Sequence, residues 1–479
     1  MCSTESESGN ERSTFHAAMY PWFAIGHIVP FLHLSNKLAE NGHRVSFLLP
    51  PKTQSKLQHL NRYPDLIRFI PIAIPPVDGL PPTAETTADV SRPIMPLLVD
   101  AMNLTKDQVE AALRNIKPDF VFFDFSYWLP PLARQLGIKS ILYCVISPAS
   151  TSYLLVPARK PDGIEQLTEE ELMQPPPGYP PDSPIRLCRH ESRSLLFAFQ
   201  KFSRTATGLT FYDRQTTSMR ECDALCFRTY REMEGPYCDY MGSQYGKPVL
   251  LTGPILPEKE KSTTVLDDDE HWCTWSSKWR LGNFKAGSVV YCAFGSECVF
   301  TKEKVQELVL GLELTGLPFL VALKPPHGAW TVEEALPDGF RERVEGRGVV
   351  YGGWVPQQQI LSHLSVGCFV SHCGYGSMWE SLVSNCQMVL LPNYGDQIKN
   401  AKLLARGMKV AVEVERREDD GWFTRESVCR AVKLVMDDDS HIGRQVKANH
   451  AKWRSFLLEE SLQRSYTDAF IRDLKALIN

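Results

Sequence analysis

Short apolar runs alternate with amphipathic helical patterns along most of this 479-residue chain, in two successive series. In the first series the apolar runs lie at 15–19, 44–49, 67–74, 120–123 and 140–146, with helical patterns at 28–40 and 129–136. Runs that are apolar throughout and separated by helices are typical of a parallel sheet covered on both faces. The pattern therefore predicts a doubly wound α/β fold.

The second series follows a charged segment at 257–269 that is rich in Pro, Ser, Thr and Asp, as interdomain linkers often are. Its apolar runs lie at 288–294, 319–323, 349–351, 368–370, 388–391 and 410–414, and a helical pattern at 463–478 ends the chain. The length predicts roughly two or three domains. We expect a first domain at 1–256, a second at 270–455, and a C-terminal helix at 456–479 that packs back toward the first.

Composition narrows the class of protein. The formal charge of −4 offers no basic surface for nucleic acid, and the thirteen cysteines lack CxxC pairs, which favours reduced thiols. Residues 1–14 are polar rather than a secretory signal, and no apolar run reaches the roughly 18 to 20 residues that span a bilayer. The sequence predicts a cytoplasmic protein without membrane insertion or a nucleic-acid partner, and we expect a monomer.

The segment QPPPGYPPDSP at 174–184 interrupts the alternation, because its prolines exclude a regular helix or a central strand. Two interpretations remain open. The segment is either a surface loop over a binding cleft or a disordered insertion.

Two polar residues follow apolar runs of the first series. His27 opens the first helical pattern and Asp124 ends the run at 120–123. In a doubly wound domain both positions lie at the carboxyl ends of strands, where ligands bind. An imidazole, with an unperturbed pKa of about 6.5, suits a general base, and a carboxylate on its far ring nitrogen would fix the tautomer. A surface or capping role is the alternative for His27, and the rival His16 lies within a predicted strand.

Residues 354–397 combine groups that suit a sugar nucleotide. Trp354 can stack on a base, although a core role is the alternative. A glycine-rich turn, SHCGYGS at 371–377, joins a predicted strand to a helix, so its N–H groups can bind a diphosphate. Asp396 and Gln397 can bind several sugar hydroxyls together, and a helix N-cap is the alternative for Asp396. Adjacent His372 and Cys373 lack zinc-ligand spacing, so no metal site is predicted.

This segment closely resembles the 44-residue signature of the plant secondary-product UDP-glycosyltransferases, and weaker similarity covers nearly the whole chain. The resemblance implies a GT-B fold, with two facing doubly wound domains and the active site in their cleft. It also implies an inverting transferase that uses a UDP-sugar as co-substrate and needs no cofactor. His27 and Asp124 match the histidine and aspartate dyad of this family.

The resemblance also implies a set of donor-binding residues. Trp354 would stack on uracil, Glu380 would bind the ribose hydroxyls, and Ser296 would contact the β-phosphate. The full set is Ser296, Trp354, Val355, Gln357, His372, Gly374, Gly376, Ser377, Glu380, Asp396 and Gln397.

One departure from the family pattern points to the acceptor. The family usually has Trp-Asn where this chain has Tyr375 and Gly376, so an amide contact to the diphosphate is absent, and a backbone amide or water can replace it. At these positions the chain resembles the branch of the family whose members extend sugars already attached to flavonoids. We therefore expect a flavonoid or anthocyanin 3-O-glycoside as acceptor, with a flavonoid or terpenoid aglycone as the alternative.

Two further questions stay open at this point. Gln397 favours UDP-glucose as the donor, while UDP-rhamnose, UDP-xylose and UDP-galactose remain possible. Phe125, Tyr127 and Trp128 follow Asp124 and are candidates for either the acceptor pocket or the core.

Other functional classes fit less well. A non-catalytic sugar-nucleotide sensor would have no need of His27 and Asp124. A dinucleotide oxidoreductase would fit the fold class, but no GxGxxG motif follows the first predicted strand.

Overall fold

The computed structural model describes residues 14–478 apart from 162–165, 202–207, 257–280 and 296. The predicted linker at 257–269 and Ser296 therefore lie outside the described residues. The chain divides into two compact units: residues up to 145, 201–255 and 464 onward form the first, while 146–200 and 256–463 form the second. The predicted domain boundaries stay a prediction.

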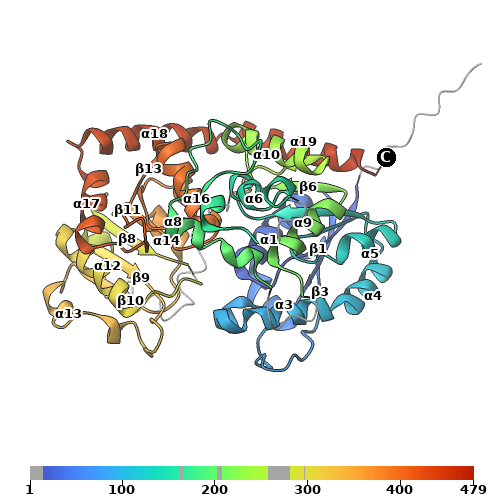
Figure 1. Ribbon diagram of the computed structural model, residues 1–479, viewed down its shortest axis with the longest axis horizontal. Helices are drawn as coiled ribbons and strands as arrows, with labels where there is room; N and C mark the ends of the chain where they lie inside the picture. Colours follow the sequence, from blue (N-terminus) through green and yellow to red (C-terminus); the bar gives the residue numbers. More distant parts are fainter. Residues whose placement is uncertain (1–13, 162–165, 202–207, 257–280, 296, 479) are drawn as a thin grey trace, which may run out of the picture. The chain divides into compact units, whose positions relative to one another are not determined.

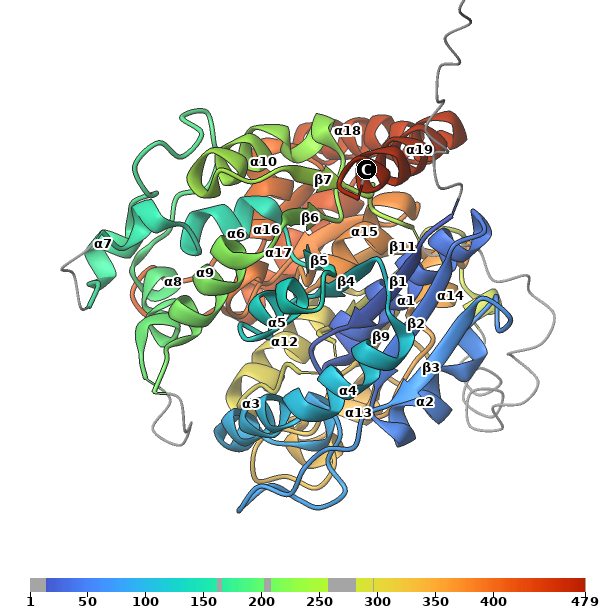
Figure 2. The same cartoon turned by 90° about the vertical axis from the view of Figure 1, so that its right-hand side faces the viewer.

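Seven parallel strands form the sheet of the first unit, in the order β3-β2-β1-β4-β5-β6-β7 (Figure 2). The strands are β1 (His16–Tyr20), β2 (Arg44–Leu49), β3 (Ile67–Pro71), β4 (Phe120–Phe123), β5 (Lys139–Cys144), β6 (Ala224–Phe227) and β7 (Val249–Leu251). The register places Met19 of β1 between Phe47 of β2 and Phe122 of β4. Because the strand order reverses between β1 and β4, their carboxyl ends form the topological switch point of this sheet.

Helices bury an apolar core against this sheet. They are α1 (Ile25–Glu40), α2 (Pro51–Leu57), α3 (Met95–Leu104), α4 (Lys106–Ile116), α5 (Leu129–Gln135), α9 (Phe211–Glu221) and α10 (Arg231–Tyr245). Phe31 of α1 and Phe122 of β4 belong to one buried cluster. Phe470 and Leu474, from the last helix α19 (Glu460–Ala476), join the same cluster. The C-terminal turns therefore complete the core of the first unit.

Six parallel strands form the sheet of the second unit, in the order β10-β9-β8-β11-β12-β13 (Figure 1). The strands are β8 (Val289–Ala293), β9 (Phe319–Ala322), β10 (Gly348–Tyr351), β11 (Val366–Ser371), β12 (Gln387–Leu390) and β13 (Ala411–Glu413). The register places Cys292 of β8 between Val321 of β9 and Val370 of β11. The switch point of this sheet lies between β8 and β11.

The segment between residues 146 and 200 belongs to the second unit and contributes helices to it. The helices of this unit are α6 (Pro148–Leu154), α7 (Glu169–Met173), α8 (Arg189–Arg193), α12 (Lys302–Thr315), α13 (Phe340–Arg343), α14 (Gln357–Ser362), α15 (Tyr375–Val383), α16 (Asp396–Lys402), α17 (Arg425–Met436) and α18 (His441–Leu457). Val309 of α12 and Val432 of α17 share a buried cluster with Val370 of β11. This core supports the strand that leads into the glycine-rich turn.

The predicted doubly wound α/β class is confirmed, because both sheets are entirely parallel. The predicted strands occur, with ends shifted by a few residues. Two strands of the first unit, β6 and β7, were not predicted; they are only four and three residues long. Short buried segments of this kind show too few residues for a clear period.

The proline-rich segment at 174–184 folds as a loop against α6. The hydroxyl of Tyr179 donates a hydrogen bond to the carbonyl of Ala149 at 2.9 Å, and its ring meets the ring of Tyr153 edge-on at 5.4 Å. Tyr179 is buried. This packing favours the surface loop over the disordered insertion.

Candidate active site

His27 and Asp124 meet at the switch point of the first sheet. Asp124 follows β4 directly, and His27 lies in the first turn of α1, just beyond β1. The Nδ1 atom of His27 lies 2.6 Å from Oδ2 of Asp124. Because a carboxylate only accepts hydrogen bonds, Nδ1 carries the proton and the lone pair is placed on Nε2. The structure thus brings the two predicted catalytic residues together in the tautomer that a general base requires.

Asp124 is fixed by a second contact. Its other oxygen, Oδ1, accepts a hydrogen bond of 2.6 Å from the backbone N–H of Trp22, and the residue is only 4% exposed. The His27 side chain is more accessible, at 22%. A buried carboxylate with both oxygens engaged and a more accessible imidazole suit an orienting group and a proton acceptor respectively.

The three aromatic residues that follow Asp124, candidates for either the acceptor pocket or the core, differ in environment. The half-buried ring of Phe125 meets His27 edge-on at 5.6 Å and stacks on Trp22 at 5.1 Å. Trp128 is buried and packs at 6.0 Å against Tyr20 of β1, so it belongs to the core. Tyr127 is half-buried, and the guanidinium of Arg214 on α9 lies 4.8 Å from the centre of its ring. Phe125 therefore forms an apolar wall beside the dyad.

His16 has a structural environment, as predicted. It lies within β1, and its Nε2 atom is 2.9 Å from the hydroxyl of Ser46 on β2. Burial, together with the nearby Arg44, lowers its pKa. His16 therefore packs in the sheet rather than beside Asp124.

The predicted glycine-rich turn joins β11 to α15 at the switch point of the second sheet. Gly374 precedes α15, and no side chain caps the N–H groups of its first turn. Cys373 has a φ of +65°, a left-handed conformation that is rare for a residue with a side chain. Such strain often accompanies functional turns. The uncapped N–H groups and the positive end of the helix are the features that favour anion binding at such a turn.

His372 lies between two glycines in this turn. A Cβ atom at Gly374 would lie 2.5 Å from Nε2 of His372, and one at Gly295 would lie 3.0 Å from the same ring. Both glycines therefore leave room for the imidazole. Burial lowers the pKa of His372 to about 4, so its ring is neutral near pH 7 and can donate a hydrogen bond to a phosphate oxygen. Gly376 faces open space, because a Cβ atom there would meet nothing within 4 Å.

Gln357, Ser377 and Glu380 form one hydrogen-bond network. The side-chain amide of Gln357 donates to the hydroxyl of Ser377 at 3.1 Å and to the carboxylate of Glu380 at 2.6 Å. The Tyr291 hydroxyl donates to Gln357 at 3.3 Å. This network joins α14 to α15, so predicted residues from the start and the middle of the segment lie together.

Trp354 and Val355 differ in environment. Trp354 is 74% exposed, an unusual position for so large an apolar side chain and one that suits a stacking platform. The core alternative for Trp354 is therefore wrong. Val355 lies in a buried cluster with Ile360 and Phe369, so its side chain is part of the core. A ligand contact from Val355 would have to come from its backbone.

Asp396 and Gln397 occupy the first turn of α16. The amide oxygen of Gln397 accepts hydrogen bonds from the backbone N–H groups of Asn393, at 3.1 Å, and Tyr394. Gly395, not Asp396, is the N-cap residue, so the capping alternative for Asp396 is wrong. Gln397 is thus oriented by the loop that follows β12.

Asn400 was not predicted, yet it connects two parts of the donor segment. Its amide nitrogen donates to the carbonyl of Cys373 at 2.9 Å and to Asp396 at 3.1 Å, and the side chain is fully buried. Its spacing of four residues from Asp396 places both on one helix face, which was the available signal. Ser150 of α6 donates to the carbonyl of Asp396 at 3.2 Å. These contacts fix the turn and the acid-amide pair relative to each other.

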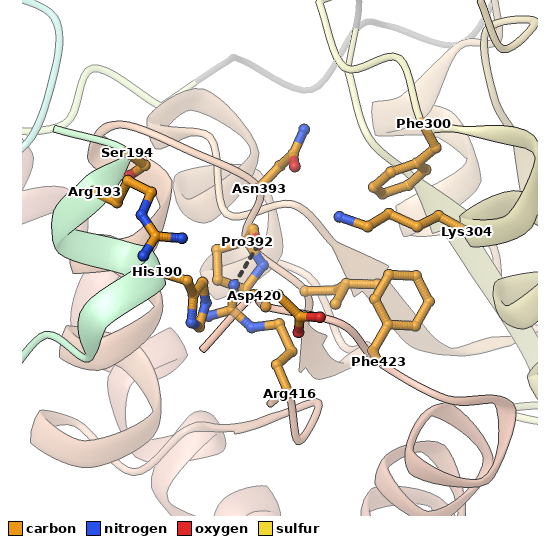
Figure 3. Close-up of a pocket in the computed structure, with 12 residues that line it drawn as sticks. His190, Arg193, Ser194, Phe300, Lys304, Pro392, Asn393, Arg416, Asp420 and Phe423 are labelled. Atoms are coloured by element: carbon orange, nitrogen blue, oxygen red, sulfur yellow. Dashed lines mark hydrogen bonds between the residues drawn. The ribbon is translucent and has the colours of Figure 1, made fainter. Parts of the chain in front are cut away.

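A cavity of about 320 Å³ adjoins this segment near Asn393 (Figure 3). Lys304 points into it, and Arg416 lies at its floor, where it donates to the carbonyl of Pro392 at 3.0 Å. Burial and the charge of Arg416 lower the pKa of Lys304. Because Asp420 also lines the cavity, its lining is polar and carries charges of both signs.

One group among the described residues has the composition of a metal site. The ligand atoms of Cys188, His190 and Glu191 lie within 4.8 Å of one another. Glu191, however, forms ion pairs of 3.0 Å with Lys402 and 2.7 Å with Arg416. Two cations already neutralise this carboxylate and would repel a third. The group is explained by this buried ion-pair network.

Comparison with known proteins agrees with this architecture. Residues 283–448 match the family described as UDP-glucoronosyl and UDP-glucosyl transferase. Among solved structures, Phytolacca americana UGT2 with UDP-2-fluoro-glucose and pterostilbene has a TM-score of 0.72 at 23% identity, covering 97% of this chain and 99% of that one. Glycyrrhiza uralensis UGT73P12 with glycyrrhetinic acid 3-O-monoglucuronide has a TM-score of 0.75 at 22% identity, covering 97% and 96%. The two parallel-sheet units thus have the GT-B fold of glycosyltransferases.

Sequence relatives are closer still. A cyanidin 3-O-galactoside 2''-O-xylosyltransferase of Actinidia chinensis var. chinensis is 55% identical, over 97% of this chain and 99% of its own length. An anthocyanidin 3-O-glucoside 2''-O-glucosyltransferase of Ipomoea nil is 51% identical, over 98% and 100%. This chain therefore belongs to the plant UDP-glycosyltransferase family, and it is a sugar transferase that uses a UDP-sugar donor.

Proposed function

We propose that this enzyme transfers a sugar from a UDP-sugar to a sugar hydroxyl of a flavonoid or anthocyanin 3-O-glycoside. The observation that carries the mechanism is the 2.6 Å contact between His27 and Asp124. The acceptor class is supported by the Tyr375-Gly376 replacement and by the two relatives, whose names specify transfer to anthocyanin 3-O-glycosides.

His27 and Asp124 would perform the proton transfer. Nε2 of His27 takes the proton of the acceptor hydroxyl as its oxygen attacks the anomeric carbon. The bond from that carbon to the UDP oxygen breaks on the opposite face, so the configuration inverts. Asp124 orients the ring and stabilises the imidazolium that forms.

The donor segment would bind the leaving group. Trp354 stacks on uracil, and Glu380, oriented by Gln357, binds the ribose hydroxyls. The N–H groups in the first turn of α15 and the side chains of His372 and Ser377 donate hydrogen bonds to the diphosphate. These fixed dipoles stabilise the negative charge that develops on UDP as it leaves. Asp396 and Gln397 bind hydroxyls of the transferred sugar.

UDP-glucose is the donor that we propose first, on the basis of Gln397. UDP-xylose is a second candidate, because two relatives, at 55% and 51% identity, are named as xylosyltransferases. Initial rates with equal concentrations of the two donors and one glycoside acceptor decide between them. A higher initial rate with UDP-xylose than with UDP-glucose would make UDP-xylose the preferred donor.

We further propose that the enzyme is a cytoplasmic monomer. Eleven cysteines lie among the described residues, and all are free thiols, as expected in a reducing compartment. No helix in the part of the chain that the structure describes is long and apolar enough to cross a membrane. Light scattering of the purified protein tests whether it is a monomer. Fractionation of plant tissue tests whether it is cytoplasmic.

Substitution of the dyad tests the mechanism. His27→Ala should lower kcat by roughly 10²- to 10⁴-fold, because it removes the general base, and should leave the Kd for UDP unchanged. Asp124→Asn should give a smaller loss, since it disturbs only the orientation and charge of the ring. Turnover of His27→Ala near that of the wild type would refute the assignment.

A further inference from the structure

Arg214 of α9 is a buried arginine whose guanidinium is only partly hydrogen bonded. The residue is 3% exposed, and Nη1 donates to the amide oxygen of Asn103 on α3 at 3.2 Å. Its Nε and Nη2 atoms are buried and have no partner among the described residues. Burial lowers the pKa of Arg214, although Tyr127 and Asp100 oppose this effect. A buried donor without an acceptor is destabilising, so its presence calls for a functional explanation.

Another arginine of the same unit shows the usual arrangement. Arg228 is equally buried, at 4% exposed, but its guanidinium donates to the backbone carbonyls of Pro254 and Ile255. The Arg228 guanidinium therefore has backbone acceptors, whereas the Nε and Nη2 atoms of Arg214 have none among the described residues.

Neighbouring groups share this shortage of acceptors. The amide nitrogens of Gln215 and Asn103 are also buried, and within the described residues neither has a hydrogen-bond partner. Phe211, Arg214 and Gln215 lie at positions i, i+3 and i+4 of α9 and so share one face of the helix. Arg214, Gln215 and Asn103 thus each carry buried N–H donors that have no acceptor among the described residues.

This region continues the aromatic wall beside the dyad. The ring of Phe211 lies 5.6 Å from that of Phe125, and Phe125 meets His27 at the same distance. The guanidinium of Arg214 lies over the ring of Tyr127, at 4.8 Å from its centre. An aromatic ligand against Phe125 would therefore extend from His27 toward the donors of Arg214.

We propose that Arg214, with Gln215 and Asn103, binds a phenolic oxygen of the acceptor in its ionised form. The Arg214 guanidinium forms no ion pair with a carboxylate of the described residues, although the charge of Asp100 acts on it. Such a guanidinium favours a ligand that supplies negative charge, and a phenolate is the anion that a polyphenol can supply. The subsite rests on the proposed function, since it selects among polyphenol glycosides. It would orient the aglycone so that its sugar reaches His27.

Equilibrium titrations of the whole enzyme with quercetin 3-O-glucoside test the proposal. Arg214→Met keeps much of the side-chain volume and removes the donors. It should weaken acceptor binding roughly tenfold to a hundredfold, the range for charged hydrogen bonds, and leave the Kd for UDP unchanged. Its Tm should equal or exceed that of the wild type, because a poorly satisfied buried charge is removed. The control Arg228→Met should lower Tm without this selective loss.

Two readouts separate recognition from a structural role. Bound to the wild type, the acceptor should show the red-shifted absorption of an ionised phenol, and bound to Arg214→Met it should not. An analogue with all aglycone hydroxyls methylated should bind both proteins alike. A lower Tm with an unchanged acceptor Kd and spectrum would overturn the proposal. If Arg214→Met does not fold, the neutral Arg214→Gln must show the same loss of the red-shifted absorption.

Failure of the proposed function would look different. If the wild type neither binds nor extends any flavonoid glycoside, the acceptor class itself is wrong. If the wild type extends glycosides and Arg214→Met binds both analogues as the wild type does, only the subsite is refuted.

Discussion

At the scale of single residues, two glycines of one turn have opposite environments. Gly374 faces the ring of His372, and Gly376 faces open space. The first glycine is required by packing, whereas the second occupies the position at which the family usually has an asparagine. Packing therefore explains the glycine at position 374 but does not explain the glycine at position 376.

Substitutions at these two positions should have opposite effects. Gly374→Ala should displace His372 and raise the KM for the UDP-sugar about tenfold or more. Gly376→Asn should leave Tm unchanged and lower that KM about tenfold or more, because an added amide can donate to the diphosphate, with a hydrogen bond to a charged group contributing roughly 1.5–3 kcal/mol. Equal effects of the two substitutions on donor KM would contradict this account of the turn.

Much of the site could be predicted at this scale. His27 and Asp124 were recognisable because each follows an apolar run, and the hydrogen bond between them confirms that they meet. For Asn400 the only local signal was its spacing of four residues from Asp396, and Arg214 offered none. Their significance comes mainly from contacts, or from missing contacts, with residues distant in the sequence.

At the scale of elements, the start of β1 depends on a neutral histidine. His43, in the turn before β2, stacks on Phe15 at 3.7 Å, and its Nδ1 atom accepts a hydrogen bond of 3.2 Å from the backbone N–H of Phe15. Burial, with a contribution from Lys475, lowers the pKa of His43 to about 4. A protonated Nδ1 could not accept that hydrogen bond.

Stability should therefore fall with acidification below about pH 6.5, the ordinary histidine pKa. The unfolded chain binds a proton at His43 between pH 6.5 and about 4 while the folded chain does not, so this contribution is complete above that window and is lost as pH falls through it. The slope is at most about 1.4 kcal/mol per pH unit. His43→Phe should lower Tm at pH 7.5 and show a weaker decline of Tm toward pH 5. An unchanged decline would contradict the role of His43.

The elements themselves were largely predictable, and the exceptions have a common cause. The strands β1, β2 and β4 stand out because they are apolar and are followed by clear turns. The segment at 224–227 lies between helices and has only four residues, too few to distinguish a strand from a buried helical turn. Its pairing with β5 is set by the sheet rather than by local preference.

At the scale of the whole molecule, the donor segment supplies protein groups where some glycosyltransferases use a metal ion. In the proposed mechanism the first turn of α15 and His372 donate hydrogen bonds to the leaving diphosphate. We therefore expect full activity in excess EDTA, measured as initial rate after gel filtration into chelator. Activity that disappears and returns with added magnesium or manganese would show that the leaving-group site has been misassigned.

The acceptor class is the central claim, and the ratio of specificity constants tests it most directly. The kcat/KM values for quercetin and for quercetin 3-O-glucoside should be measured with one saturating UDP-sugar. NMR of the products should locate the new bond. This account predicts a clear preference for the glucoside, with the new bond on a hydroxyl of its sugar. A preference for quercetin, or a bond to an aglycone hydroxyl, would contradict it.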